Sequence, residues 1–371
     1  MAITTEMNES NTRTISLIVT ERCNLSCVYC YEHNKSASDM TFDRAKQIID
    51  RELIYGKPKE NTYIEFFGGE PFLNFDLIKQ VYDYVMSFYK GKIRFFATTN
   101  GTLVHGDIAE WLSARKNFSV GLSLDGNRVA HNLNRSDSFD KIDLAFFLKN
   151  YPEQPIKMTV SELSMPYFSE SVKYLTSLGF TVACNLAYMV DWLSESNVKT
   201  LAEQLNDLIS WYADDPNIKK CSMLDFKIER LAYDTQSNEK IKKYCGTGTA
   251  MVCYDMRGTA YPCQLFAPIS AGSKAITTEQ ANIHDELDID LLDRECADCY
   301  YLKICPFCLG SNYLSCGDLY KPDKARCKLY KMIFAANAKL KAIEWARGTL
   351  KCDKDTEQAL LRSIVHIQNL Q

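Results

Sequence analysis

The chain has 371 residues, of which 46% are hydrophobic, and a formal net charge of −4. This length suits one large domain and a smaller one. The acidic balance argues against a phosphate-binding surface, so nucleic acid is not an expected partner. No apolar run reaches the length of a membrane span, and the polar start Met1–Arg13 does not resemble a signal peptide. We therefore expect a cytoplasmic protein with no membrane partner.

Cysteine is abundant, with 15 residues. Disulfides are rare in a reducing cytosol, where clustered cysteines more often bind metal or take part in chemistry. The odd total also argues against a fully paired disulfide framework. The cysteine clusters are therefore candidate metal sites.

Short β-rich runs alternate with longer amphipathic runs in the first half of the chain. The predicted strands are Thr14–Thr20, Thr62–Phe67, Ile93–Thr98, Phe118–Leu124, Ile156–Ser161 and Thr181–Ala187. The predicted helices are Phe42–Ile54, Phe75–Tyr89, His105–Arg115, Phe139–Leu148, Tyr167–Leu178 and Glu195–Tyr212. Six βα units in succession predict an α/β fold with a parallel sheet, in which the loops after the strands share one rim.

The composition changes after Asp214-Asp215-Pro216. Nine of the 15 cysteines lie between Tyr244 and Cys327, in a segment of short elements that needs metal to be compact. Two apolar stripes after Cys327 predict C-terminal helices. The predicted division is a tail at 1–12, an α/β domain at 13–213, a bridging region at 214–243, a Cys-rich domain at 244–327 and helices at 328–371.

Three cysteines follow the first predicted strand within eight residues: Cys23, Cys27 and Cys30. A four-iron cluster normally takes four thiolates, so three thiolates leave one iron open to a substrate. Zinc is an alternative, with His33 as a fourth ligand, and buried free cysteines are another. The spacing favours the iron–sulfur cluster.

The Cys-x3-Cys-x2-Cys spacing, with Tyr29 as the aromatic residue before the last cysteine, resembles the motif of radical S-adenosylmethionine (radical SAM) enzymes. The resemblance covers about Arg13 to Ala187. It implies a partial (β/α)6 TIM-like barrel, a [4Fe-4S] cluster on the three cysteines and SAM bound at the open iron.

Residues at the ends of the next three strands continue this resemblance. Gly68, Gly69 and Glu70 match the loop that binds the SAM amino group, where glycines permit close backbone approach and Glu70 offers a carboxylate. The resemblance also implies contacts to the SAM ribose and carboxylate from Asn100, Ser123, Asp125 and Arg135. For Asn100 and Ser123 the alternative is ordinary turn chemistry, since Asn-Gly and Ser/Asp-Gly segments commonly form turns. Asn127 stands where the family usually has proline.

The later cysteines are spaced like those of the SPASM domain, a C-terminal extension of radical SAM enzymes that carries two auxiliary [4Fe-4S] clusters. The resemblance assigns four cysteines to the outer cluster: Cys296, Cys299, Cys305 and Cys327. It assigns Cys245, Cys263 and Cys308 to the inner cluster, with Cys253 as the candidate fourth ligand and Cys316 as an alternative. Without a fourth ligand, the inner cluster has an open iron that could hold a substrate thiolate.

Two features qualify the SPASM resemblance. The spacer between Cys305 and Cys308 has two residues, where the family usually has three. From spacing alone, the paired Cys-x2-Cys motifs also suit a zinc ribbon. A zinc-binding adaptor without catalysis is therefore the main non-enzyme hypothesis.

The resemblance implies an oxidoreductase that uses a 5′-deoxyadenosyl radical to abstract hydrogen from a peptide. We favour a crosslinking peptide maturase, with a thioether preferred over a carbon–carbon bond, because Val19–Cys23 and Tyr31–Lys35 look like the corresponding segments of such enzymes. Formylglycine formation by sulfatase maturases is disfavoured, since Gln264 follows Cys263 where those enzymes have an acidic base, and glutamine cannot take a proton. Epimerisation needs a thiol donor, for which Cys184 and Cys221 are candidates, although core packing explains them more simply.

The expected partners follow from the same resemblance. They are a Cys-containing precursor peptide and an electron donor such as flavodoxin or ferredoxin. Only 22 residues precede Cys23. We therefore expect no fused N-terminal leader-binding domain, and leader binding could fall to a separate protein.

Overall fold

The protein is described from a computed structural model that covers residues 11–56, 58–188, 190–232, 243–287 and 289–370. Residues 1–10 of the predicted tail and 233–242 of the predicted bridging region lie outside the described residues. Contacts group the chain into two units. One unit comprises residues 1–124, 131–157 and 245–285, and the other comprises 125–130, 158–244 and 286–371. The domain boundaries predicted from the sequence divide the chain differently and stay a prediction.

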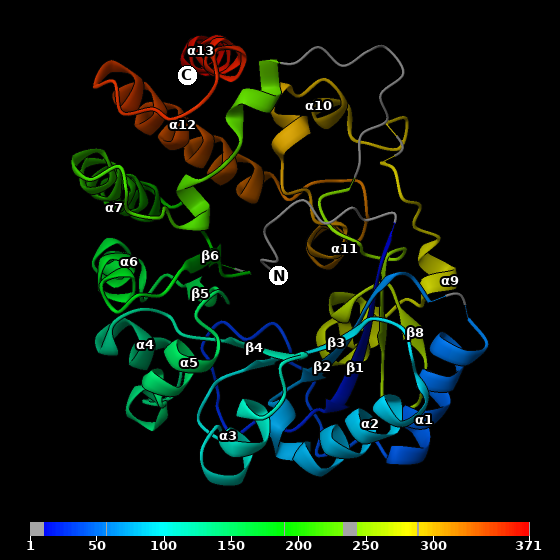
Figure 1. Ribbon diagram of the computed structural model, residues 1–371. Helices are drawn as coiled ribbons and strands as arrows, with labels where there is room; N and C mark the ends of the chain where they lie inside the picture. Colours follow the sequence, from blue (N-terminus) through cyan, green and yellow to red (C-terminus); the bar gives the residue numbers. More distant parts are fainter. Residues whose placement is uncertain (1–10, 57, 189, 233–242, 288, 371) are drawn as a thin grey trace. The chain divides into compact units, whose positions relative to one another are not determined.

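Four parallel strands form the centre of the first unit. They are β1 (Thr12–Thr20), β2 (Asn61–Gly68), β3 (Ile93–Thr99) and β4 (Phe118–Leu122). They pair in the order β4-β3-β2-β1. The helices α1 (Phe42–Ile49), α2 (Phe75–Phe88) and α3 (Gly106–Ser113) connect them and lie along one face of the sheet (Figure 1). The α/β class and the parallel order are confirmed.

An aromatic core joins this sheet to its helices. Phe66, Phe95 and Phe118 stand on three adjacent strands, with ring centroids 5.8–6.2 Å apart and nearly parallel planes. Trp111 of α3 meets Phe118 edge-on at 5.3 Å. Because side chains alternate along a strand, Glu65 and Phe96, the neighbours of these rings in sequence, point to the opposite face. The sheet thus has an apolar face under helices and a second face with polar residues.

Two more strands follow, β5 (Ile156–Val160) and β6 (Val182–Leu186), which pair with each other. A parallel bridge joins Ser123, just after β4, to Lys157. The N–H of Leu124 donates to the carbonyl of Lys157 at 3.0 Å. All six predicted strands are confirmed. Helices α4 (Arg128–Asn134), α5 (Leu144–Asn150), α6 (Phe168–Ser177) and α7 (Glu195–Asp214) belong to this part of the chain.

Two helix predictions need correction. The helix predicted at Phe139–Leu148 is a 3-10 turn at Phe139–Lys141 followed by α5. Asp143 causes the break, because its side chain caps α5 by accepting a hydrogen bond from the N–H of Phe146 at 3.0 Å. The helix predicted at Phe42–Ile54 is α-helical only to Ile49, and its last turn is a π-helix.

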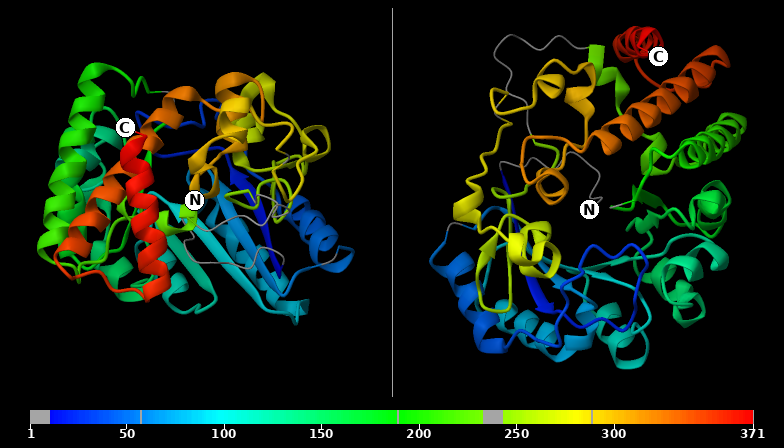
Figure 2. Two further views of the ribbon diagram at one scale, coloured as in Figure 1. Left: turned by 90° about the horizontal axis from the view of Figure 1, so that it is seen from above. Right: turned by 180° about the vertical axis from the view of Figure 1, so that it is seen from behind.

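A hairpin from the Cys-rich segment extends the first sheet. β7 (Met251–Tyr254) pairs in parallel with β1, and β8 (Ala260–Tyr261) pairs with β7 in the antiparallel sense. Figure 2 shows this hairpin beside β1 in both views. This pairing was not predicted, because β7 is only four residues long and β8 only two, too short for a hydrophobic period to stand out. Cys253 is therefore carried by a strand of the central sheet.

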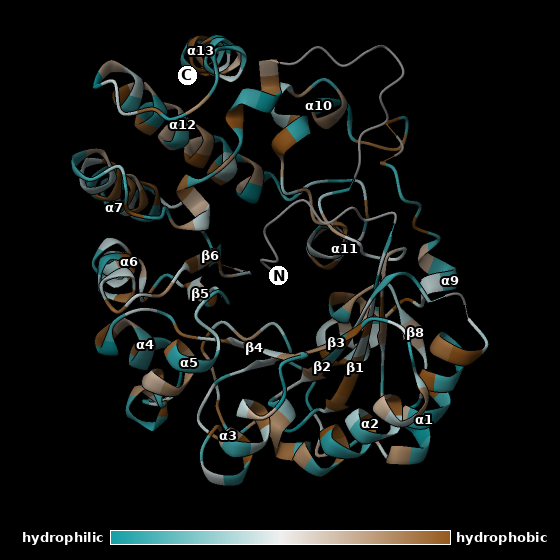
Figure 3. Ribbon diagram, viewed as in Figure 1, coloured by the Kyte–Doolittle hydropathy of each residue, from teal (hydrophilic) through white to brown (hydrophobic). Residues whose placement is uncertain are grey.

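Short helices and two long ones complete the chain. They are α8 (Pro268–Ala271), α9 (Thr278–Ala281), α10 (Arg294–Ala297), α11 (Leu309–Cys316), α12 (Lys324–Ala346) and α13 (Lys354–Asn369). Polar and apolar residues alternate around α12 and α13 (Figure 3). Among the described residues, no helix has both the length and the apolarity needed to cross a membrane.

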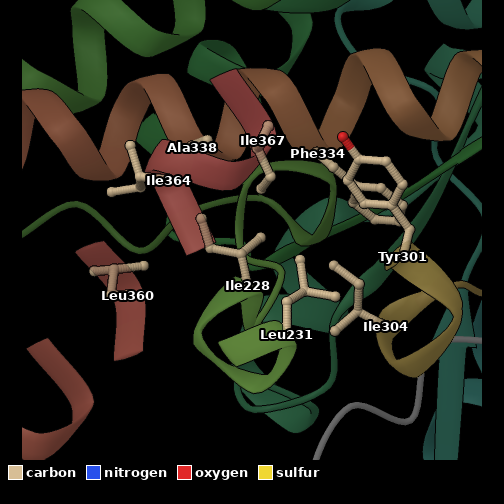
Figure 4. Close-up of a cluster of buried hydrophobic side chains, with 9 residues drawn as sticks. All are labelled: Ile228, Leu231, Tyr301, Ile304, Phe334, Ala338, Leu360, Ile364 and Ile367. Atoms are coloured by element: carbon tan, nitrogen blue, oxygen red, sulfur yellow. The ribbon is translucent and has the colours of Figure 1, made fainter. Parts of the chain in front are cut away.

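The long helices share a buried core with the Cys-rich segment of the second unit (Figure 4). Tyr301 and Ile304, which lie between Cys299 and Cys305, pack against Phe334 of α12. Ile364 and Ile367 of α13 belong to the same cluster. This core gives the cysteine-bearing turn an apolar anchor that does not depend on metal.

Candidate functional site

The first cysteine cluster lies on a loop directly after β1. Cys23, Cys27 and Cys30 all line one open cavity of about 780 Å³, together with His33 and Lys35. The cavity is formed within the first unit. The structure therefore brings the three predicted ligands to a common space.

Glycines let the loop after β2 approach this cysteine loop. A Cβ on Gly68 would lie 1.9 Å from the carbonyl oxygen of Thr20, and one on Gly69 would lie 2.2 Å from that of Arg22. Gly68 also has a φ of 130°, which side chains disfavour. The N–H groups of Gly69 and Glu70 donate to the same two carbonyls at 3.1 and 2.8 Å. Only glycine permits this backbone contact.

Glu70 connects the loops after β2 and β3. Its buried carboxylate accepts hydrogen bonds from the Thr99 hydroxyl at 2.7 Å and from the N–H of Asn100 at 2.8 Å. Burial raises the pKa of Glu70 to about 7, against the effect of these hydrogen bonds. The contacts give Glu70 a role in holding the rim together. Its predicted role in binding the SAM amino group stays a prediction.

Asn100 ties the third strand end to the cysteine loop. Its amide nitrogen donates to the side-chain oxygen of Asn24 at 2.8 Å, and Asn24 donates in turn to Thr102 at 2.8 Å. Ser123 follows β4 and pairs through its backbone with Thr99 and Lys157. In the second unit, the buried Asp125 accepts a hydrogen bond from the N–H of Thr159 at 2.9 Å.

Two cations lie beside the cysteines. The Lys35 ammonium donates to the Cys30 sulfur at 2.9 Å. The Arg135 guanidinium lies 3.9 Å from the Cys27 sulfur and 5.3 Å from the centre of the Tyr29 ring. Positive charge favours the thiolate form that binds metal. Tyr29 and Arg135 were predicted from the sequence; Lys35 was missed, because a lysine five residues after a cysteine has no distinctive pattern.

Metal binding must still deprotonate these thiols. Burial raises the pKa of Cys23 to about 11. Among the described residues, no three His, Cys, Asp or Glu side chains converge as the ligands of one metal ion do. The cavity, the thiol set and the flanking cations fit a cluster, whereas the assignment of the ligands stays a prediction.

The four cysteines assigned to the outer auxiliary cluster lie close together in the second unit. The pKa of Cys305 is raised to about 12, first by burial and then by the charges of Cys299, Cys327 and Cys296. Burial and the charges of Cys327 and Cys299 raise the pKa of Cys296 to about 11. Mutually repelling thiolates in one place are the donor set that a cationic metal centre stabilises. This grouping supports the predicted set.

The inner set is divided between the two units. Cys253 is fully buried on β7, and burial followed by the charge of Cys263 raises the pKa of its thiol. Cys245 lies 3.1 Å from the Thr247 hydroxyl. In the second unit, Cys308 caps α11 by accepting from the N–H of Ser311 at 3.4 Å, and Cys316 is exposed. Cys253 and Cys263 are therefore neighbours, and their roles as ligands stay a prediction.

Known proteins resemble this chain in sequence. Residues 17–146 match the radical SAM superfamily. An uncharacterized protein of Methanocaldococcus jannaschii is 37% identical over 171 residues, which are 44% of this chain and 58% of that protein. The AdoMet-dependent heme synthase of Methanosarcina barkeri is 25% identical over 84% of this chain and 97% of its own length. A cysteine-type anaerobic sulfatase-maturating enzyme of Clostridium perfringens is 26% identical over 76% of this chain and 84% of its own length.

Solved structures share the fold. Native anSMEcpe with bound AdoMet matches with a TM-score of 0.67 at 22% identity, over 89% of this chain and 98% of its own. Streptococcus suis SuiB bound to precursor peptide SuiA matches with a TM-score of 0.50 at 15% identity, over 86% of this chain and 77% of its own. The chain carries a radical SAM domain, and its fold is that of radical SAM enzymes with a Cys-rich C-terminal region.

Proposed function

We propose that the chain is a radical SAM peptide maturase that installs a thioether crosslink in a ribosomally made, Cys-containing precursor peptide. The observation that carries this proposal is the set of three thiols on one open cavity, held by the Gly68-Gly69 contact and flanked by Lys35 and Arg135. Three thiolates leave a four-iron cluster one open iron, which is where SAM would bind.

The residues around the cavity suit this chemistry. A [4Fe-4S] cluster held by Cys23, Cys27 and Cys30 would supply the electron that cleaves SAM into methionine and a 5′-deoxyadenosyl radical. The rim residues would hold the charged groups of SAM, with Arg135 suited to its carboxylate and the loop at Gly68–Glu70 suited to its ammonium. The protein's own tasks are to position SAM and the peptide and to exclude water.

Thioether formation removes two hydrogens from the peptide. One leaves carbon as a hydrogen atom and converts the 5′-deoxyadenosyl radical into 5′-deoxyadenosine. The other leaves the cysteine thiol as a proton, which passes to solvent. One electron remains. The outer cysteine set would hold an auxiliary [4Fe-4S] cluster, which would supply an acceptor for this electron, with a carrier such as flavodoxin or ferredoxin as its destination.

Two resemblances support a polypeptide substrate. The Clostridium relative is named for maturing a sulfatase, and SuiB was solved with a precursor peptide. Formylglycine formation is less well supported for this chain, because Gln264 cannot accept a proton at neutral pH. The buried side-chain oxygen of Gln264 has no hydrogen-bond partner within the part of the chain that the structure describes.

Epimerisation is also less well supported. Cys184 and Cys221 are both buried in the second unit. The N–H of Cys184 donates to the Ser222 hydroxyl at 2.8 Å, and the N–H of Cys221 donates to the Tyr212 hydroxyl at 2.8 Å. Both cysteines are therefore packed in a protein interior, which is the ordinary setting of a free cysteine.

A second candidate function is hydrogen abstraction from an iron porphyrin. The observation that favours it is the heme synthase relative, which this chain matches over 97% of that protein's length. The two candidates share the radical-forming step and differ in the substrate and in the bond that changes, so one experiment separates them.

That experiment uses protein reconstituted anaerobically with iron and sulfide, then given SAM and dithionite. One arm adds a library of short Cys-containing peptides, and the other adds an iron porphyrin. Mass spectrometry follows each substrate and chromatography follows 5′-deoxyadenosine. Loss of two hydrogens from the peptide, with fragmentation placing a sulfur–carbon bond, supports the proposal. A change in the mass of the porphyrin, with the peptide unchanged, would replace the proposal with the second candidate. A peptide whose mass is unchanged in ordinary water but which takes up deuterium in heavy water would indicate an epimerase.

A further inference from the structure

Two oppositely charged side chains lie on the face of the first sheet that the helices do not cover. Glu65 stands in the middle of β2, in register with Ser16 of β1 and Phe96 of β3. Its sequence neighbour Phe66 belongs to the aromatic core under the helices. Glu65 therefore points to the opposite side of the sheet, as Phe96 does.

Glu65 is buried but has no partner. It is only 7% exposed, and its carboxylate has no hydrogen bond or ion pair within the described part of the chain. Because so little of the residue is exposed, few water molecules reach the carboxylate, and a hydrogen-bond donor on a bound molecule would be favoured there.

Lys157 reaches across the same face from β5. Its stem crosses Gly121 of β4, where an added Cβ would lie 3.3 Å from the Lys157 Cε and 2.9 Å from the Phe96 ring. The ammonium then lies 4.9 Å from the centre of that ring and donates to the Thr98 hydroxyl at 2.6 Å. Glycine at position 121 therefore leaves the space through which Lys157 passes.

Glu65 and Lys157 interact electrostatically but form no ion pair. Burial lowers the pKa of Lys157, and the negative charge of Glu65 opposes that effect. Yet no nitrogen–oxygen pair between them lies within the 4.0 Å of an ion pair. Glu65 is in register with Phe96, and the Lys157 ammonium lies over the Phe96 ring, so an acceptor and a donor lie on the same face of the sheet. Each has bonding capacity left, since the ammonium has three N–H groups and the carboxylate two oxygens.

We propose that Glu65 and Lys157 bind one amide unit of the substrate peptide's main chain. Glu65 accepts the amide N–H, and Lys157 donates to the adjacent carbonyl. This inference rests on the proposed function for its ligand. Such contacts would fix the register of the peptide on the sheet through its backbone N–H and C=O groups. The identity of the reacting side chain would then be determined at neighbouring positions of the peptide.

The alternative is a structural charge pair that only fills the sheet. The two roles differ when both charges are removed together. A structural pair is destabilised by each single substitution and restored by the double substitution, because neither charge is then left alone. A binding pair loses its ligand in all three variants.

The test compares Glu65→Leu, Lys157→Met and the double variant with the wild type. The matched control is Glu60→Leu with Lys92→Met, a solvent-exposed pair in the same unit, 3.7 Å apart. The probe is the fluorescein-labelled peptide that the wild type modifies, and its affinity is measured by anisotropy with SAM bound. Iron content and thermal unfolding show which variants fold.

We expect the single variants and the double variant each to bind the peptide about tenfold or more weakly, with the control unchanged; hydrogen bonds to charged groups contribute about 1.5–3 kcal/mol. A peptide with an ester in place of the bound amide should lose affinity for the wild type and not for Glu65→Leu. Unchanged affinity in the single variants, or affinity restored in the double variant, would overturn the site while leaving the proposed function intact. A wild type that modifies no peptide would overturn the proposed function and the ligand named here with it.

Discussion

The two cysteine groups of this protein are built by different means. Cys23, Cys27 and Cys30 sit on a strand-end loop that the protein holds through backbone contacts at Gly68 and Gly69. Lys35 lies beside the Cys30 thiol and Arg135 beside the Cys27 thiol, and all three cysteines line an open cavity. In the outer group, Cys296 lies on α10, Cys299 and Cys305 flank a 3-10 turn, and Cys327 lies on α12. Burial, and after it the charges of neighbouring cysteines of the group, raise the pKa of the Cys296 and Cys305 thiols.

We propose that this difference separates a reactive centre from a structural or electron-carrying one. Backbone contacts hold the loop of the first group in place. Its three thiols would leave one iron of a four-iron cluster open to a substrate. The second has four thiols and an apolar anchor on only one side, at Tyr301 and Ile304. We infer that the first loop keeps its shape without metal, whereas the second needs metal to hold its turns together.

The largest expected effect is from Cys27→Ala. Loss of one of three thiols should remove the first cluster, because the remaining two cannot hold it. We expect 5′-deoxyadenosine formation to fall by roughly three orders of magnitude or more and iron to fall from about twelve to about eight atoms per chain. Cys352→Ala is the control, since Cys352 is exposed and outside both groups. Equal loss of activity in both variants would contradict the comparison.

The next prediction removes the outer metal. Cys305→Ser should lose about four irons and open the segment 289–323 to limited proteolysis, because the three remaining cysteines then have no metal that holds their segments together. The first cluster should keep its EPR signal. If the protease instead cleaves the loop at residues 22–38, the two groups do not differ in the way described.

A third prediction concerns the glycine contact. Gly68→Ala should destabilise the reconstituted protein by about 2–4 kcal/mol, because the new Cβ clashes with the Thr20 carbonyl and the backbone is strained. Gly106→Ala is the matched control: Gly106 also has a positive φ, of 46°, but no atom lies within 4 Å of its Cβ position. Anaerobic urea unfolding measures the loss of unfolding free energy in both variants. Equal losses would show that the contact between Gly68 and the Thr20 carbonyl has no special importance.

The smallest effect is expected from Lys35→Met. Removing the donor to Cys30 should lower the reduction potential of the first cluster by about 20–60 mV, the equivalent of one hydrogen bond of about 0.5–1.5 kcal/mol. Lys35→Arg keeps a donor and should retain most of the wild-type potential. EPR-monitored redox titration gives the value. A potential that rises on removal of Lys35 would reverse the role assigned to it.

The local elements of the fold were largely predictable from the sequence. The strands and the helix at Phe75–Tyr89 follow from hydrophobic periodicity, and the observed α2 buries Leu77, Ile78, Val81 and Val85 at helical spacing. The break before α5 was missed because a single side-chain cap at Asp143 outweighs the helical pattern. The pairing of β7 with β1 is a long-range contact between short segments, for which periodicity carries no information.

The candidate site was predictable where a motif has fixed spacing. The three cysteines, Tyr29 and Arg135 come together as the resemblance implied. Lys35, Glu65 and Lys157 were missed, because their importance lies in partners brought by folding: a thiol for Lys35, and for the other two a shared sheet face. Glu70 was predicted to face SAM, whereas its observed partners are Thr99 and Asn100.

The most direct test of the central claim is EPR spectroscopy of the anaerobically reconstituted, dithionite-reduced protein with and without SAM, together with metal analysis. If the first loop holds a four-iron cluster with an open iron, SAM should change the signal of one cluster, and the change should be absent in Cys27→Ala. A protein that takes up zinc in place of iron, or whose cluster signals do not respond to SAM, would contradict the account.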